Sequence, residues 1–219
     1  ERKQAQESLL AAEKDYRSIF EKAPIGIIQS TPDGRYTKVN MTMARIYGYD
    51  SPQDMIQNIN DISSQIYVEP SGRLEFLRRL TEQNEVIEFE SQNKRKDGSH
   101  IWTSVDARTI RNEAGEIQYF EGFVRDITGR KQAEEAVRQA ETHFKALIEN
   151  APDGIALVGL DGKTRYASPT AKTMLGYNAE DDVHVNSVEF IHPDDLNTVI
   201  GAMNDLIQNP AYVPTLEYR

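Results

Sequence analysis

Cysteine is absent from this chain of 219 residues. Without a thiol, the chain cannot form a disulfide, a thiolate metal site, an iron-sulfur cluster or a thioether bond to a cofactor. No apolar run approaches the roughly 20 residues that a membrane-spanning helix requires. These absences exclude several redox and metal mechanisms, and they predict that this chain makes no membrane contact.

Positive charge is also scarce, because 25 Lys and Arg residues stand against 35 Asp and Glu residues. Binding to nucleic-acid phosphates requires clustered Lys and Arg, so we expect no nucleic-acid partner. One basic cluster, Lys94-Arg95-Lys96, precedes a predicted turn, and we interpret it as a solvated hairpin tip. We expect a cytoplasmic chain, which leaves open a membrane anchor elsewhere in the parent protein.

The chain contains an internal duplication. Residues 1–51 align without a gap on residues 129–179, with seventeen identities in fifty-one positions. A repeat of this length suits a small domain with its own core plus a connecting helix. The duplication therefore predicts two domains in tandem.

The repeat also gives expected domain boundaries. We place an incoming linker helix at 1–15, a first domain at 16–128, a linker helix at 129–143 and a second domain at 144–219. The second copy stops where the first continues into further strands. We therefore expect a fragment whose second domain is truncated before its last strands and whose output domain lies elsewhere.

Apolar residues recur at spacings of three and four along the linker helix. The stripe consists of Ala133, Val137, Ala140 and Phe144, and residues 2–20 carry a similar one. A stripe so narrow and rich in Ala cannot hold a lone helix, so it must pack on its own domain or on a second copy. We expect a homodimer, with a domain-capping helix as the alternative.

Short strand-like segments joined by turns follow the first helix. Residues 25–30 and 35–40 flank an Asp-Gly pair, which is a strong hairpin signal. Asn40 is expected to cap the next helix, and Ser168 does the same in the second copy. Gly48 is a residue type suited to a left-handed helix end.

The rest of the first domain reads as helices and then strands. Residues 51–83 predict short helices, the last of them amphipathic through Leu74, Leu77 and Leu80. Three strands are then expected at 86–94, 100–110 and 117–127, separated by turns. The fold class is therefore α+β, with five strands able to form one antiparallel sheet.

When the two copies are overlaid, the motifs APDGI, DGK, GY and HPDD of the second copy, followed by KRKDGSHIW and DITGRKQAEE of the first, resemble the PAS domain with its C-terminal PAC segment. Such domains occur in tandem in bacterial and archaeal sensor histidine kinases and cyclic-dinucleotide enzymes. The resemblance implies a five-stranded antiparallel sheet with flanking helices, in two copies joined by a helical linker. It also implies a sensor without catalytic chemistry, whose cavity holds flavin, haem, a small metabolite or nothing.

The resemblance limits the cofactors. Flavin photoadducts and the thioester-bound chromophore of photoactive yellow protein need a cysteine, which this chain lacks. Haem is disfavoured, because residues 71–84 contain no axial histidine. We expect no cofactor, with a non-covalent flavin or a small metabolite as alternatives. We interpret the histidines as solvated or helix-capping rather than as metal ligands, namely His100, His143, His184 and His192.

Alignment with flavin-binding PAS sequences through Trp102, together with strand alternation, implies a set of cavity-facing residues. They are Phe89, Ser91, Asn93, Thr103, Val105, Phe120, Gly122 and Val124. The ring of Trp102 is expected on the opposite face. The DIT triplet implies that Asp126 and Thr128 couple the last strand to the outgoing helix, and the alternative is an ordinary helix cap.

No catalytic motif appears, so catalytic residues are not expected. The resulting hypothesis is a sensory input and dimerisation module of a signal-transduction protein. It would couple a cavity ligand or partner state through the DIT motif and the linker helix to an output domain, as in a sensor histidine kinase or diguanylate cyclase. The alternative is a ligand-free structural relay.

Overall fold

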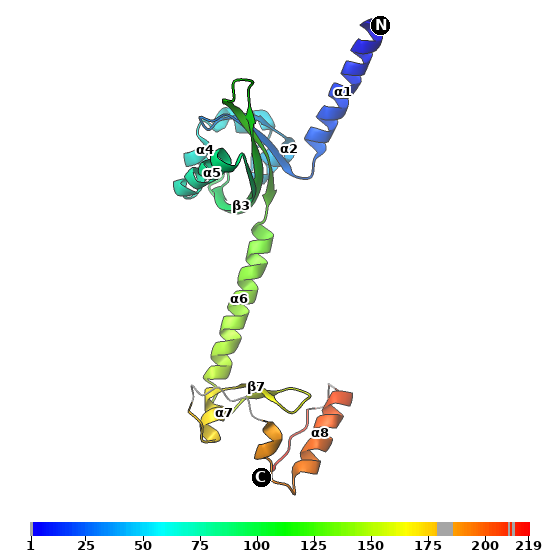
Figure 1. Cartoon of the computed structure of the whole chain (residues 1–219), viewed down its shortest axis with the longest axis vertical. Helices are drawn as coiled ribbons and strands as arrows, with labels where there is room; N and C mark the ends of the chain where they lie inside the picture. The colour runs from blue at the N-terminus through cyan, green and yellow to red at the C-terminus, as the bar shows by residue number, and fades with distance from the viewer. Residues whose placement is uncertain (1, 179–185, 210, 212) are drawn as a thin grey trace. The chain divides into compact units, whose positions relative to one another are not determined.

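The computed structural model describes residues 2–178, 186–209, 211 and 213–219, so His184 lies outside the described residues. The chain divides into two compact units, Glu1–Glu135 and Ala136–Arg219, which we describe separately (Figure 1). Among the described residues, no helix combines the length and the apolar character needed to cross a lipid bilayer.

The first unit is built on a five-stranded sheet. Its strands are β1 (Gly26–Ser30), β2 (Tyr36–Val39), β3 (Glu85–Lys94), β4 (His100–Arg111) and β5 (Ile117–Asp126). They lie in the order β2-β1-β5-β4-β3, and every neighbouring pair is antiparallel. The predicted α+β fold with one five-stranded antiparallel sheet is confirmed.

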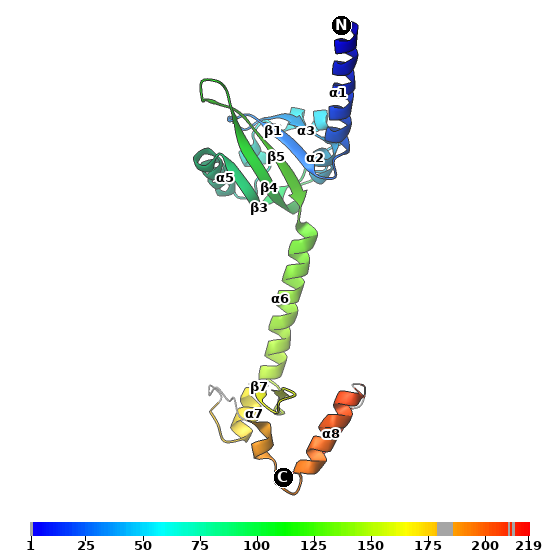
Figure 2. The same cartoon turned by 45° about the vertical axis from the view of Figure 1, so that its right-hand side comes forward.

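Four helices connect β2 to β3 and pack on one face of the sheet (Figure 2). They are α2 (Met41–Ile46), α3 (Pro52–Asn58), α4 (Ile62–Gln65) and α5 (Pro70–Gln83). The side-chain oxygen of Asn40 accepts a hydrogen bond from the Met43 N–H, which caps α2 as predicted. Gly48 follows the C-terminal end of α2 with φ +75°, a left-handed conformation that glycine adopts without strain.

The buried side of α5 differs from the prediction. Leu80 is fully buried and Leu77 packs against the core, but Leu74 is 68% exposed. Arg73 and Phe76 are buried instead. The leucine spacing alone misassigned the helix face because a charged residue, Arg73, lies inside.

Strand β3 contains an irregularity in its pairing with β4. Glu88 has φ +51°, and its N–H donates to the Asp106 carboxylate at 2.7 Å. Val86 and Phe89 both point into the core, while Ile87 is 68% exposed. The bulge therefore turns one large apolar side chain out of the core.

Two long helices precede and follow the five strands in the sequence, α1 (Arg2–Lys22) and α6 (Thr128–Glu149). Each extends beyond the expected linker segments 1–15 and 129–143. Neither helix buries a residue. Their stability therefore requires contacts beyond their own turns.

The described part of the second unit holds a two-stranded sheet and three helical segments. They are β6 (Ala156–Val158), β7 (Thr164–Ala167), α7 (Pro169–Met174), the 3-10 turn η1 (Ser187–Phe190) and α8 (Leu196–Gln208). The hydroxyl of Ser168 accepts from the Ala171 N–H and caps α7, as predicted. Ser168 thus takes the role that Asn40 has in the first copy.

Candidate functional site

The cavity-facing residues expected from the sequence lie on the face of the sheet that the helices cover. Seven of them have side chains that are at most 9% exposed, namely Phe89, Ser91, Asn93, Thr103, Val105, Phe120 and Val124. Gly122 lies on the same face, where an added Cβ would lie only 2.5 Å from the Asp106 carbonyl oxygen. Close packing of β4 against β5 thus requires glycine at this position.

The polar members of this set form one hydrogen-bonded group. The side-chain nitrogen of Asn93 donates to the Tyr47 hydroxyl and to the Thr103 hydroxyl, each at 2.7 Å. The Ser91 hydroxyl donates to the Asn93 carbonyl oxygen at 3.2 Å. Burial raises the pKa of Tyr47 well above its ordinary value, so the phenol remains neutral. These polar groups satisfy one another and need no ligand for that purpose.

Little space remains inside this core. The cavity between sheet and helices measures about 20 Å³. That volume suits about one water, whereas sites for drug-sized molecules usually measure about 300–1,000 Å³. Side chains such as Tyr36, Tyr67 and Phe76 fill the region. The residues present therefore fit neither haem nor flavin. Arg73, which the sequence analysis did not single out, also lines this cavity.

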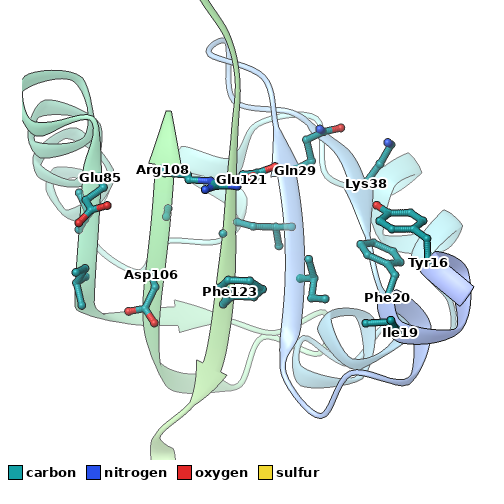
Figure 3. Close-up of a pocket in the computed structure, with 16 residues that line it drawn as sticks. Tyr16, Ile19, Phe20, Gln29, Lys38, Glu85, Asp106, Arg108, Glu121 and Phe123 are labelled. Carbon is teal, nitrogen blue, oxygen red and sulfur yellow. Dashed lines mark hydrogen bonds and ion pairs between the residues drawn. The ribbon is translucent and has the colours of Figure 1, made fainter. Parts of the chain in front are cut away.

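A larger hollow lies on the opposite face of the same sheet. This outer groove measures about 560 Å³ and runs across the strands, with Tyr16, Ile19 and Phe20 of α1 at one side (Figure 3). Phe123 contributes an apolar surface that is 45% exposed, and Ile87 adds another. The apolar residues of the groove are spread over α1, β1, β3 and β5, so no local sequence pattern predicts it.

Ion pairs between neighbouring strands cross the outer groove. Arg108 donates to Glu121 at 2.7 Å, and Arg125 lies 2.8 Å from Asp106. Figure 3 shows Arg108 and Glu121 side by side on β4 and β5. The groove thus has apolar patches beside paired charges.

Asp126 and Thr128 form the junction between the sheet and α6. The Asp126 carboxylate accepts from the Thr128 N–H at 2.9 Å. The Thr128 hydroxyl accepts from the Trp102 N–H at 3.0 Å, and the Ile127 N–H donates to the Trp102 carbonyl oxygen at 2.9 Å. The triplet therefore caps α6 and also attaches it to β4.

Charged side chains reinforce this junction. Glu90 on β3 pairs with Arg130 and lies 2.6 Å from Lys131, both in the first turns of α6. These pairs lower the pKa of Glu90, with Lys131 as the larger cause. Lys131 also lies over the Trp102 ring, 5.3 Å from its centre. The sequence analysis missed Glu90, because pairing across strands gives no local sequence signal.

The basic cluster before the turn is not simply solvated, and that interpretation was wrong. Arg95 donates to Asp126 at 3.0 Å and to the Ile46 carbonyl oxygen at 2.9 Å. Lys96 lies 2.6 Å from Asp54 on α3. The hairpin tip therefore connects the end of β5 to the helices.

Among the residues that the structure describes, none of the linker stripe is buried. Val137 is 59% exposed and Phe144 is 63% exposed, and Ala133 and Ala140 are exposed as well. Leu147 continues the stripe at 58% exposure. The stripe is thus an apolar surface open to a partner.

The HPDD segment of the second unit binds the end of the chain. Asp195 precedes α8, and its carboxylate accepts from the Arg219 backbone N–H at 2.9 Å. The hydrogen bond from the Arg219 side chain, at 3.2 Å, and then the one from its backbone N–H lower the pKa of Asp195. His192 lies beside Asp194, and within the described segments no group of three or more potential ligand residues could hold a metal ion.

Comparisons with known proteins agree with this architecture. A family model described as "PAS domain" matches residues 24–129, and one described as "PAS fold" matches residues 142–210. The sensor protein FixL of Bradyrhizobium diazoefficiens is 29% identical over 93 residues, 42% of this chain and 18% of that protein. The sensor histidine kinase TmoS of Ectopseudomonas mendocina is 26% identical over 151 residues, 67% of this chain and 15% of that protein.

Solved structures resemble the chain in part. A sensory box histidine kinase/response regulator from Burkholderia thailandensis aligns with a TM-score of 0.46 and 22% identity, covering 60% of this chain and 98% of that one. The chain spans less than a fifth of the length of the two sensor proteins above, 18% and 15%.

Proposed function

Because the chain belongs to the PAS family, with two PAS domains in tandem, we propose that it is the sensory input and dimerisation module of a signal-transduction protein. PAS sensor domains are non-catalytic themselves. The proposed output is a separate catalytic domain, and the resemblance to sensor kinases supports this assignment. In this proposal the signal travels from the first sheet into α6.

The observation that carries the proposal is the double attachment of α6 to the sheet. Thr128 hydrogen-bonds to Trp102 on β4, and Glu90 on β3 pairs with Arg130 and Lys131. Two strands therefore hold the first turns of the helix. A change in the spacing or tilt of these strands would move α6 rather than leave it in place, which is how a local event gains a distant effect.

The exposed stripe on α6 supports the dimerisation part of the proposal. A helix that is amphipathic but buries nothing is marginal alone in water, and pairing with a second copy covers its apolar side. Val137, Phe144 and Leu147 supply that side. The alternative of a domain-capping helix would have placed these residues against their own domain.

The absence of cysteine makes a direct test practical, because a spin label can be attached to a single introduced Ala146→Cys. Position 146 lies on the helix face opposite the stripe. Pulsed electron paramagnetic resonance then measures the distance between the two labels of a dimer. We expect the double variant Glu90→Ala and Thr128→Val to shift or broaden that distance.

The matched control is Glu113→Ala in the β4–β5 turn, which should leave the distance unchanged. An unaltered distance in the junction variant would contradict transmission through the junction. The absence of any distance between two copies at high protein concentration would contradict the dimer.

A second candidate function is the ligand-free structural relay. The cavity of about 20 Å³ favours it, because the core is nearly filled by its own side chains. In that case the input to the first domain is a partner protein or the preceding part of the parent chain. Both candidates use the same junction with α6.

A further inference from the structure

Arg73 lies where a charged side chain is unusual. It belongs to α5, is 5% exposed and lines the cavity between the helices and the sheet. Its Nη2 atom has no hydrogen-bond partner, and no carboxylate of the described chain forms an ion pair with it. The neighbouring Arg78 and Arg79 on the same helix both pair with Glu75.

A buried guanidinium without an anionic partner is costly. Arginine carries five N–H donors and stays protonated, so it cannot lower this cost by losing its charge. Arg73 lies over the Phe76 ring, 5.4 Å from its centre. That contact is with an aromatic ring and leaves Nη2 without a hydrogen-bond acceptor. The Asp61 carboxylate interacts electrostatically with Arg73, which contributes to lowering the pKa of Asp61, but it forms no ion pair with the guanidinium, so Nη2 has no acceptor.

The lining of the cavity does not supply an anionic acceptor. Neutral hydroxyl and amide groups surround the space, from Ser30, Tyr36, Tyr67 and Asn93. Burial raises the pKa of Tyr67 and the guanidinium of Arg73 opposes this rise, but the phenol stays neutral near pH 7. Glu121 also borders the cavity, yet its carboxylate pairs with Arg108 on the outer face.

We propose that this cavity is a binding site for a small monovalent anion of the size of chloride or formate, with Arg73 as the charged donor. The volume of about 20 Å³ sets the size, because it suits about one water, and chloride and formate are among the smallest anions. The nearby hydroxyl groups can donate further hydrogen bonds to the anion. The proposal does not depend on signal transmission through α6, because anion binding is measured directly and not through the position of that helix.

The test uses the full chain and formate as the probe. Saturation-transfer NMR on the formate proton detects binding directly, and thermal unfolding at constant ionic strength measures stabilisation by formate. Gluconate is the control anion, because it is too large for the cavity. We expect a formate signal that chloride displaces and gluconate does not, with a melting temperature that rises and saturates.

The variant Arg73→Met should lose both effects, whereas Arg45→Met, which removes an exposed arginine from α2, should keep them. Formate effects that are equal in a folded Arg73→Met variant would overturn the proposal. If that variant does not fold, the wild-type competition decides, because a formate signal insensitive to chloride would also overturn it. The absence of any formate signal would mean that only water occupies the site, and the proposal would then be wrong.

Discussion

The backbone N–H of Trp102 donates a hydrogen bond to the hydroxyl of Thr128 at 3.0 Å, so the first residue of α6 is attached to strand β4. A threonine at the start of a helix usually serves the helix itself. Here its hydroxyl serves a neighbouring strand, while the Asp126 carboxylate accepts the N–H of Thr128. Helix capping and attachment to the sheet are therefore separate functions of the two residues.

Replacing Thr128 with Val should remove this one hydrogen bond and keep the shape of the side chain. The Trp102 N–H would lose its side-chain acceptor in a partly buried position, which costs about 1–2 kcal/mol in the free energy of unfolding. Urea unfolding followed by the fluorescence of Trp102 measures this, because that residue is the single tryptophan and reports on the first domain. Thr142→Val, on the exposed surface of α6, is the control. Equal losses in the two variants would contradict the role of this bond.

Tyr47→Phe should destabilise the core of the first domain. The side-chain nitrogen of Asn93 would lose one of its two acceptors in a fully buried setting, at a cost of about 1–3 kcal/mol. The same urea titration gives the free energy of unfolding. Tyr16→Phe is the matched control, because Tyr16 is 58% exposed. A result near that of the control would show that Asn93 finds another partner.

Glu90 gives the junction a dependence on pH. Its pKa in the folded chain is lowered from 4.5 by Lys131 and Arg130. A lowered pKa means that the stabilisation is present above about pH 4.5 and is lost as the pH falls through the folded value. Hydrogen exchange at the start of α6 should therefore speed up below pH 4.5 in the wild type, relative to its intrinsic rate.

The variant Glu90→Gln should show weaker protection of α6 already at neutral pH and a smaller further loss in acid. Glu113→Gln, in the turn between β4 and β5, is the control and should follow the wild type. A wild-type pH profile in Glu90→Gln would assign the acid effect to other carboxylates.

Self-association should depend on the α6 stripe. Val137→Glu combined with Phe144→Glu introduces charge on both exposed apolar positions and should weaken the dimer by at least tenfold, as measured by sedimentation equilibrium. The matched control is Thr142→Glu combined with Ala146→Glu, which adds the same charge to the opposite face. Circular dichroism checks that the fold is retained. Equal association of both double variants would contradict pairing through the stripe.

The strands of the first domain could be predicted because local chemistry determines them. Gly34 and Gly98 have φ of +87° and +83°, which is why turns occur at both Asp-Gly pairs. The resemblance to flavin-binding PAS sequences, aligned through Trp102, together with alternation then assigned Phe89, Ser91 and Asn93 to the buried face. These are short-range rules, and they held wherever the strand was regular.

The remaining features depend on contacts between distant segments. Alternation does not predict the bulge at Glu88, which turns Ile87 outward. The placement of Arg73 inside the core contradicts its residue type, so leucine spacing favoured Leu74 instead. Arg95 pairs with Asp126, thirty-one positions later, and no local pattern indicates such a pairing.

Strand β3 lies at the edge of the sheet, where unpaired N–H and C=O groups invite the strand of another molecule. Its second half is covered, because the Val68 N–H donates to Gln92 and the Lys94 N–H donates to Ile66. The first half contains the bulge at Glu88, which interrupts the regular ladder. This edge of the sheet is thereby protected against strand-to-strand aggregation.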